Sequence, residues 1–520
     1  MIIMRAQWTK VFGLGFVAFG FVGAASLAVA TPTMDETTEA VQAKLQVDSF
    51  SLIELESPVS PDQPFVTEVE LGGRAHLVAL SPHSVRAPDF RVLAVDGESV
   101  RVVEPPAPAT YLGELIDSPG SQISAARVHD GWRMIVRLGD RDERWDVVPL
   151  AEILPDAPKS IHVVYDPRDA EVDGWLCGNV LFDLDHPIRG RAREHVHSEE
   201  TEPVVEPDAD PIMLAELAYD ADFEFFNRNG RSIDNVIADI ESITLDMNVI
   251  YERDCFIRHQ ITTIVIREGE PDPYNSTSAD GLLDEFRAEW NTLQSGVVRD
   301  VAHLMTGKSL EGSVIGLAYL GVICNQSFGY GLSESKFTSN LSQRVGLTAH
   351  EIGHNWDSGH CNQSCSGGSD CRIMCPCIAG CSGDVTAFGQ ASINAITSFR
   401  DTLDCLEVYN PFVLGSTDFI SRQRANVDVT GGFPNQEVRV YYSLRGPGSC
   451  SIPEFNVQLD LQNCILGLTG QTDSAGVRTW RVDVPYIQSR RPILLQAAQD
   501  STGLETPQKT DPIVRWLLPR

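Results

Sequence analysis

Basic side chains are scarce in this sequence. Its 520 residues include 40 lysines and arginines against 72 aspartates and glutamates, which gives a formal net charge of −32. Binding to the phosphate backbone of nucleic acids requires basic patches, so this balance argues against a nucleic-acid partner. Apolar residues make up 42% of the chain and charged residues 22%. That composition is typical of a globular protein and excludes collagen, a disordered tail and a multi-span membrane protein.

Long apolar runs are also rare, because only residues 11–30 form one of the length that spans a bilayer. This run follows Arg5 and Lys10 and ends in the small-x-small tripeptide Ala-Val-Ala at 28–30. A basic start, an apolar stretch and a small-residue ending are typical of a secretory signal peptide. An uncleaved anchor helix is the alternative. The ending favours cleavage, so we predict a secreted, extracellular protein with no stable membrane span.

Cysteine is almost absent from the first 254 residues of the chain. Cys177 stands alone there, eleven of the 12 cysteines follow from Cys255 onward, and six of them lie between Cys361 and Cys381. In a cytosolic protein this clustering would indicate a metal site. After a signal peptide it indicates disulfides formed in an oxidising compartment.

The remainder of the chain divides into three parts. Residues 31–193 carry mostly strand patterns, including a hairpin predicted for 131–138 and 144–149. Residues 194–211 hold seven acidic residues and three prolines but no lysine or arginine. Such a stretch cannot bury much apolar surface, so it is predicted to be a linker.

Residues 212–408 alternate helix and strand signals. Apolar side chains at three-to-four spacing predict a helix at 232–251, and further helices are expected at 279–292 and 390–403. This mixed order indicates an α/β layer. Residues 409–520 instead show short alternating runs between Gly, Pro and Asp turns, which predicts a small all-β sandwich.

The strongest functional signal is a histidine cluster near the end of the α/β part. His350 and His354 are four residues apart, so on a helix they project from one face and can hold one zinc ion. His360 can reach the same ion only if the helix ends and the chain turns back. Three protein ligands leave one position open for water, as in catalytic zinc sites. Glu351 is placed to accept a proton from that water.

The segment HEIGHNWDSGH at 350–360 resembles the zinc helix of metzincin peptidases, HExxHxxGxxH. Its HEIGHN core is most similar to the adamalysin/reprolysin (ADAM-like) branch. The resemblance implies an α/β metzincin-type catalytic domain, with a twisted mixed sheet, a zinc helix and a Met-turn. It also implies a zinc-dependent endopeptidase acting on proteins or peptides, with Glu351 as general base.

The same resemblance assigns a role to Met374, in CRIMCP at 371–376. It would be the Met-turn residue, an apolar floor under the ligands, and plain core packing is the alternative. Asp357 stands where the family has a turn glycine. If that position needs a positive φ, aspartate tolerates it better than most residues. Gly359 is the other place where the chain could turn.

Two more segments, IMLAELAYD at 212–220 and DVAHLMTG at 300–307, resemble family sequences. By resemblance, Glu216, Asp300 and the carbonyl of Cys405 would bind a structural calcium, for which oxygen donors are suited. A solvated acidic surface is the alternative. His303 is expected to be a packed or surface histidine.

Residues 111–150 follow the order of motifs in reprolysin-type propeptides. Cys177, in WLCGNV, resembles the cysteine switch of such propeptides, whose thiolate occupies the water position on zinc. A disulfide is the alternative for Cys177. The basic stretch at 189–193 is a candidate for release, and a solvated turn is the alternative there. The favoured pairs are Cys324–Cys405 and Cys450–Cys464, and the other cysteines remain open.

The expected domains are a signal peptide at 1–30, a pro-domain with the acidic linker at 31–205, a catalytic domain at 206–408 and a C-terminal module at 409–520. Substrate would pair as an added antiparallel strand with a sheet edge within Gly316–Tyr330. The alternative is a catalytically silent extracellular adhesion or binding protein that reuses the fold. The intact glutamate and histidines favour the enzyme.

Overall fold

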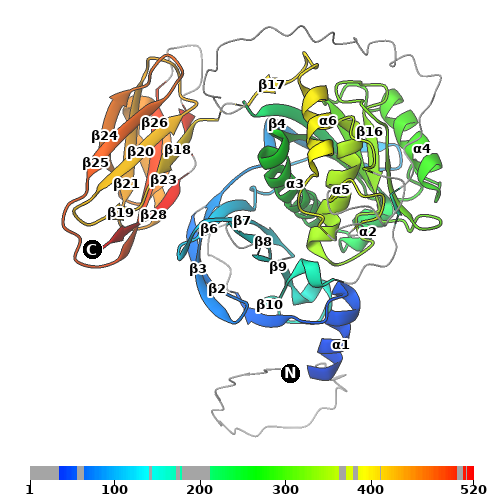
Figure 1. Ribbon diagram of the computed structural model, residues 1–520. Coiled ribbons are helices and arrows are strands. Elements are labelled where there is room, and N and C mark those ends of the chain that lie inside the picture. Colours follow the sequence, from blue (N-terminus) through cyan, green and yellow to red (C-terminus); the bar gives the residue numbers. More distant parts are fainter. Residues whose placement is uncertain are drawn as a thin grey trace, which may run out of the picture.

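The computed structural model describes residues 34–55, 64–129, 131–139, 143–170, 176–177, 211–361, 371–378, 384–409, 411–500, 508–510 and 512–519 (Figure 1). The expected signal peptide and nearly all of the acidic linker lie outside the described residues. No helix within the described ranges is long and apolar enough to cross a membrane.

The N-terminal part forms an antiparallel sheet of eight strands, in the order β1-β10-β9-β8-β7-β6-β3-β2. The strands are β1 (Ser51–Glu54), β2 (Phe65–Leu71), β3 (Arg74–Pro82), β6 (Thr110–Leu115), β7 (Ser118–Val128), β8 (Gly131–Leu138), β9 (Glu143–Pro149) and β10 (Ile161–Tyr165). Helix α1 (Met34–Leu45) precedes them. The predicted hairpin is the β8–β9 pair. We call the described residues 34–170 the N-terminal β-domain; they include the strands β4 and β5, which are introduced below.

A second, mixed sheet carries the histidine cluster. Its central order is β15-β16-β14-β12-β13. These strands are β12 (Met213–Ala221), β13 (Ile257–Arg267), β14 (Val301–Met305), β15 (Val314–Ala318) and β16 (Tyr330–Ser333). Four of them run parallel, and β15 is antiparallel to β16. The short β17 (Glu407–Val408) pairs with β12.

Helices cover both faces of this mixed sheet. They are α2 (Phe223–Arg228), α3 (Ile233–Cys255), α4 (Ala279–Thr292), α5 (Leu341–Asn355) and α6 (Gln390–Arg400). Side chains of β12 alternate between faces, so Leu217 packs in the cluster of α3 and α5, whereas Ala218 packs in the cluster of α4. The helices expected at 232–251, 279–292 and 390–403 are therefore present, with α3 longer and α6 shorter than predicted.

The mixed sheet extends beyond the α/β part at both edges. Strand β4 (Arg86–Asp96) pairs in parallel with β13, and β5 (Ser99–Val103) pairs with β4. Figure 1 shows β4 beside the helices of the α/β part rather than in the N-terminal sheet. At the opposite edge, β11 (Leu176–Cys177) pairs in parallel with β15. Segments that precede the linker thus occupy both edges.

The C-terminal part is all β. One sheet contains β18 (Val413–Ser416), β20 (Arg424–Thr430) and β25 (Arg478–Asp483). The larger sheet contains β19 (Phe419–Ile420), β21 (Glu437–Ser443), β24 (Ile465–Gln471), β26 (Arg491–Gln499), β27 (Gln508–Lys509) and β28 (Ile513–Leu518). Strands β22 (Pro447–Ile452) and β23 (Val457–Leu461) form a separate pair. Val427 of the first sheet and Val440 of the second belong to one apolar cluster, so the two sheets share a core.

Helix α4 offers a matched test of this packing. Leu282 is 0% exposed, whereas Leu293, at the C-terminal end of the same helix, is 71% exposed. Replacing Leu282 by alanine removes buried apolar contacts and leaves a cavity, so we expect Leu282→Ala to lower the free energy of unfolding by about 3 kcal/mol. Leu293→Ala should change it by less than about 0.5 kcal/mol. Calorimetric melting of both variants checks this, and equal losses would contradict the packing.

Candidate active site

Helix α5 carries the first two histidines of the cluster, and its start is fixed by several side chains. Asn340 caps the helix by accepting a hydrogen bond from the Gln343 N–H at 3.1 Å. The Ser342 N–H donates to Asp146 of β9 at 2.9 Å, and the Leu341 N–H donates to the Tyr165 hydroxyl of β10 at 3.0 Å. Two first-turn N–H groups of α5 therefore find acceptors in the N-terminal β-domain, which the sequence did not reveal.

The three histidines converge on one point. Nε2 of His360 lies 3.1 Å from Nε2 of His350 and 3.2 Å from Nε2 of His354. Nδ1 of His350 lies 2.6 Å from the Ile373 carbonyl, and Nδ1 of His354 lies 2.7 Å from the Ser358 carbonyl. A carbonyl can only accept, so both Nδ1 atoms carry the proton and both Nε2 atoms present lone pairs.

This convergence fits a metal ion better than hydrogen bonds between the rings. Nε2 of His360 can donate its proton to only one of the two lone pairs that it meets, whereas one cation can accept all three nitrogens. A tetrahedral zinc with bonds of about 2.0–2.1 Å places its nitrogens about 3.3–3.4 Å apart. The carbonyl acceptors at Nδ1 are the outer partners that orient zinc-binding imidazoles. The donor set therefore fits zinc.

Burial favours the neutral imidazoles that a metal requires. Burial first, and the nearby His360 second, lower the pKa of His354 to about 3. Burial and the two other imidazoles also lower the pKa of His350, and burial lowers that of His360. All three rings are thus neutral at pH 7 and available as ligands.

A tight turn brings His360 back to the helix. Helix α5 ends at Asn355, and Asp357 adopts a φ of +67° while its N–H donates to the His354 carbonyl at 2.9 Å. The positive φ therefore falls on Asp357, at the family's glycine position. Gly359 does not share it, so the alternative turn position is not used.

The carboxylate of Glu351 is buried under the edge strand β15. A β-carbon placed on Gly316 of that strand would overlap Oε1 of Glu351. Only glycine therefore allows the sheet edge to pass so close to the carboxylate. Sequence reasoning missed this role of Gly316, although a glycine inside a strand pattern signals a close approach.

Met374 lies beneath the helix, as the resemblance implied. It is fully buried, and a β-carbon on Gly353 would lie 2.8 Å from its sulfur. The segment is held by the Cys361 N–H, which donates to the Met374 carbonyl at 3.1 Å, and by a Cys361–Cys371 disulfide. Its placement suits an apolar floor, and its functional role stays a prediction.

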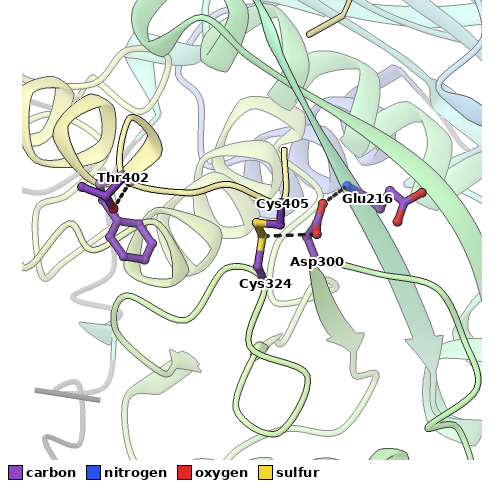
Figure 2. Close-up of a disulfide and its surroundings, with 6 residues drawn as sticks. Glu216, Asp300, Cys324, Thr402 and Cys405 are labelled. Atoms are coloured by element: carbon purple, nitrogen blue, oxygen red, sulfur yellow. Dashed lines mark hydrogen bonds between the residues drawn. A yellow bond between two sulfur atoms is a disulfide. The ribbon is translucent and has the colours of Figure 1, made fainter. Parts of the chain in front are cut away.

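The residues expected to bind calcium lie around a disulfide (Figure 2). Cys324 and Cys405 are bonded to each other, as favoured, and so are Cys450 and Cys464. One oxygen of Asp300 accepts the Glu216 N–H at 2.8 Å, and the other lies 3.3 Å from the Cys324 sulfur. The disulfide sulfurs are not available as ligands, so a cation there would depend on oxygen atoms. The calcium site stays a prediction.

Two other candidate residues can also be placed. His303 is buried, with Nε2 2.9 Å from the Ser333 hydroxyl, so it is a packed histidine, as expected. Cys177 is described by its backbone, which pairs with Gly316 in the β11–β15 ladder. The expected substrate edge at Gly316–Tyr330 is only partly right. Gly316 lies on the edge strand of the α/β part, but Tyr330 begins the interior strand β16.

Together, a mixed sheet, a histidine-bearing helix, a turn that returns a third histidine and a buried methionine define a zinc metallopeptidase of the metzincin class. The model of metallo-peptidase family M12, reprolysin type, matches residues 214–391, a range that includes the whole cluster. The zinc metalloproteinase recombinant fibrinogenase II of Deinagkistrodon acutus is 30% identical over 173 residues, which are 33% of this chain and 72% of that protein. The chain belongs to metallopeptidase family M12 and is a zinc metalloendopeptidase.

The turn at Asp357 yields a test. A left-handed backbone costs alanine about 1 kcal/mol, glycine nothing and aspartate an amount in between, so Asp357→Ala should destabilise the metal-free protein by less than about 1 kcal/mol. Asp357→Gly should retain zinc binding with equal or higher stability. Gly359→Ala is the control, because a β-carbon there meets open space and φ is not positive. Melting temperatures and chelator competition for zinc measure both effects; no loss in Asp357→Ala would contradict a strained turn.

Proposed function

We propose that this chain is a secreted zinc endopeptidase made as a zymogen, with His350, His354 and His360 as ligands and Glu351 as general base. The observation that carries the proposal is that Nε2 of His360 lies 3.1 Å from Nε2 of His350 and 3.2 Å from Nε2 of His354. The apolar run at 11–30 and the disulfides of the described residues support export.

Bound zinc supplies a Lewis acid for the scissile carbonyl and lowers the pKa of the water that it holds. The protein's own residues do the rest. The Ile373 and Ser358 carbonyls keep the proton of each helical imidazole on Nδ1. Glu351, next to the first ligand and under the edge strand, accepts the proton of the attacking water and passes it to the leaving amine.

Strand β15 is the proposed substrate-binding edge. Its pairing with β11 supports this, because an added strand already occupies that edge. Strand β11 runs parallel to β15, opposite to the antiparallel direction expected of a substrate, so it would cover the edge without lying there as a substrate does. Gly316 faces Cys177 in that ladder and passes over Glu351. A pro-segment at this edge therefore keeps substrate away from the general base, which supports a latent form and the switch role of Cys177.

Replacing the general base Glu351 should separate zinc binding from catalysis. We expect Glu351→Ala to retain zinc and to lose casein cleavage by about 10²- to 10⁴-fold, since it removes only the proton acceptor. The control variant His360→Ala should lose both zinc affinity and cleavage. Zinc content and cleavage are measured on the activated protein. Equal cleavage by Glu351→Ala would refute the mechanism, and zinc binding without cleavage in the unmutated protein would favour the adhesion alternative.

The switch role of Cys177 predicts a spectroscopic signature. Cobalt substituted into the uncut protein should show a thiolate-to-metal charge-transfer band, because a thiolate would be the fourth ligand. Cys177→Ala should abolish the band and raise the activity of the uncut chain. Cys255→Ala is the control, because Cys255 is the buried free thiol of the described residues and should affect neither. A band that persists in Cys177→Ala would exclude the switch.

A further inference from the structure

The N-terminal β-domain and the peptidase part share secondary structure. Strand β4 adds to the edge of β13 over six paired residues, from Arg86 opposite Ile261 to Val95 opposite Arg267. Further backbone hydrogen bonds, from the Ile261 N–H to the Val85 carbonyl and from the Glu268 N–H to the Val95 carbonyl, are both 2.8 Å long. Removing this strand would expose the open edge of β13, which is unfavourable in a soluble protein.

The two parts also share one apolar core. Val92, Ile135 and Val163 of the N-terminal part belong to the same buried cluster as Ile240 and Ile352 of the peptidase helices. Helix α3 is correspondingly buried on nearly all of its sides between residues 236 and 251. A surface helix would keep a polar, solvated face. The face of α3 toward the β-domain is therefore apolar, and exposing it to water would be unfavourable.

Buried ion pairs also link the N-terminal β-domain to the peptidase part. Asp239 of α3 accepts from Arg344 at 3.0 Å and pairs with Lys336 at 2.6 Å. Arg133 of β8 donates to Asp239 and also to Glu152 of the β-domain, at 2.8 Å. Arg133 is 1% exposed and Asp239 0%. Separation would take the cation Arg133 away from Asp239 and the anion Asp239 away from Arg133, and breaking a buried pair in this way is costly in a protein interior.

The C-terminal part also contacts the β-domain. Ala79 of β3 packs in one apolar cluster with Tyr441 and Leu494, and Ile116 packs against the same cluster. Arg515 of β28 lies 3.4 Å from Glu114 of β6. In Figure 1 the C-terminal sheets lie beside this side of the β-domain. The β-domain thus lies between the two other parts of the chain.

We propose that the N-terminal β-domain is a resident subunit of the active peptidase, held without a covalent link after the connector is cut. This rests on the zymogen function proposed above and changes how activation works. Strand β11 begins six residues after Ala170, the last described residue of the β-domain. A cut at 189–193 therefore leaves β11 tethered to a domain that does not leave. Activation requires a second cut between Ala170 and Leu176, so that the segment bearing β11 is excised.

Two engineered cleavage sites test this in the secreted full-length protein. One recognition sequence is inserted after Ala170 and a different one after Glu200, so that each can be cut separately. The piece that ends at Ala170 contains no cysteine, so no disulfide can retain it. We expect it to co-elute with the peptidase on gel filtration at micromolar concentration after both cuts. Casein cleavage should appear only after both cuts, and the cut after Glu200 alone should leave the enzyme latent.

The outcomes separate the two proposals. Elution of residues 31–170 away from a folded, active peptidase overturns the resident subunit. Full activity after the Glu200 cut alone overturns the two-cut activation. Co-elution after both cuts with no cleavage by the zinc-loaded protein upholds the resident subunit and refutes the peptidase function proposed above.

A matched pair of variants locates the contact. Arg133→Met removes a buried cation from the interface, whereas Arg101→Met removes the 54% exposed Arg101 side chain, which pairs with Glu268. In the doubly cut protein, Arg133→Met should raise the dissociation constant of the β-domain at least about tenfold. Arg101→Met should raise it less than about threefold. Equal effects of the two variants would contradict the buried contact. If Arg133→Met does not fold, co-elution of the unmutated pieces still decides the proposal.

Discussion

The interaction on which the site depends is the approach of two imidazole lone pairs to one ring nitrogen of His360. His350 and His354 donate from Nδ1 to backbone carbonyls, so their Nε2 atoms have no proton to share with each other or with His360. Without a cation, Nε2 of His360 can donate to only one of these two lone pairs at a time. The left-handed turn at Asp357 and the chain around Met374 exist in this form because they hold those carbonyls and the third ring in place. Stability is thus given up locally for metal affinity.

Local sequence predicted the parts of this site that local geometry determines. Spacing of four places His350 and His354 on one helical face, and the need to return His360 predicted a special backbone conformation, which the structure puts at Asp357. The helices at 279–292 and 390–403 and the β8–β9 hairpin followed from periodicity in the same way. The favoured Cys324–Cys405 pair is present.

Contacts between segments that are distant in the sequence could not be predicted from such local patterns. Gly316 meets Glu351 because a strand crosses a helix, and nothing in either segment specifies that crossing. Asp146 and Tyr165 reach the start of α5 from 196 and 176 residues away. The composition change at the acidic linker indicated where the chain can be cut, but the pairing of β4 with β13 shows that the packing boundary lies elsewhere. Register between strands depends on the whole assembly rather than on one segment.

In the proposed latent form, a tether would explain how so short a strand blocks the proposed substrate edge. A segment linked to a bound domain is present at an effective concentration that can reach the millimolar range, of order 1 mM, so weak pairing is sufficient to occupy the edge. Strand β11 pairs with β15 at only two described positions. Cutting the chain beyond β11 does not change its link to the β-domain, and therefore does not lower that concentration. The effective concentration falls only when the link before Leu176 is cut as well. The segment that bears β11 is then a free peptide, which must compete with substrate at its own low concentration.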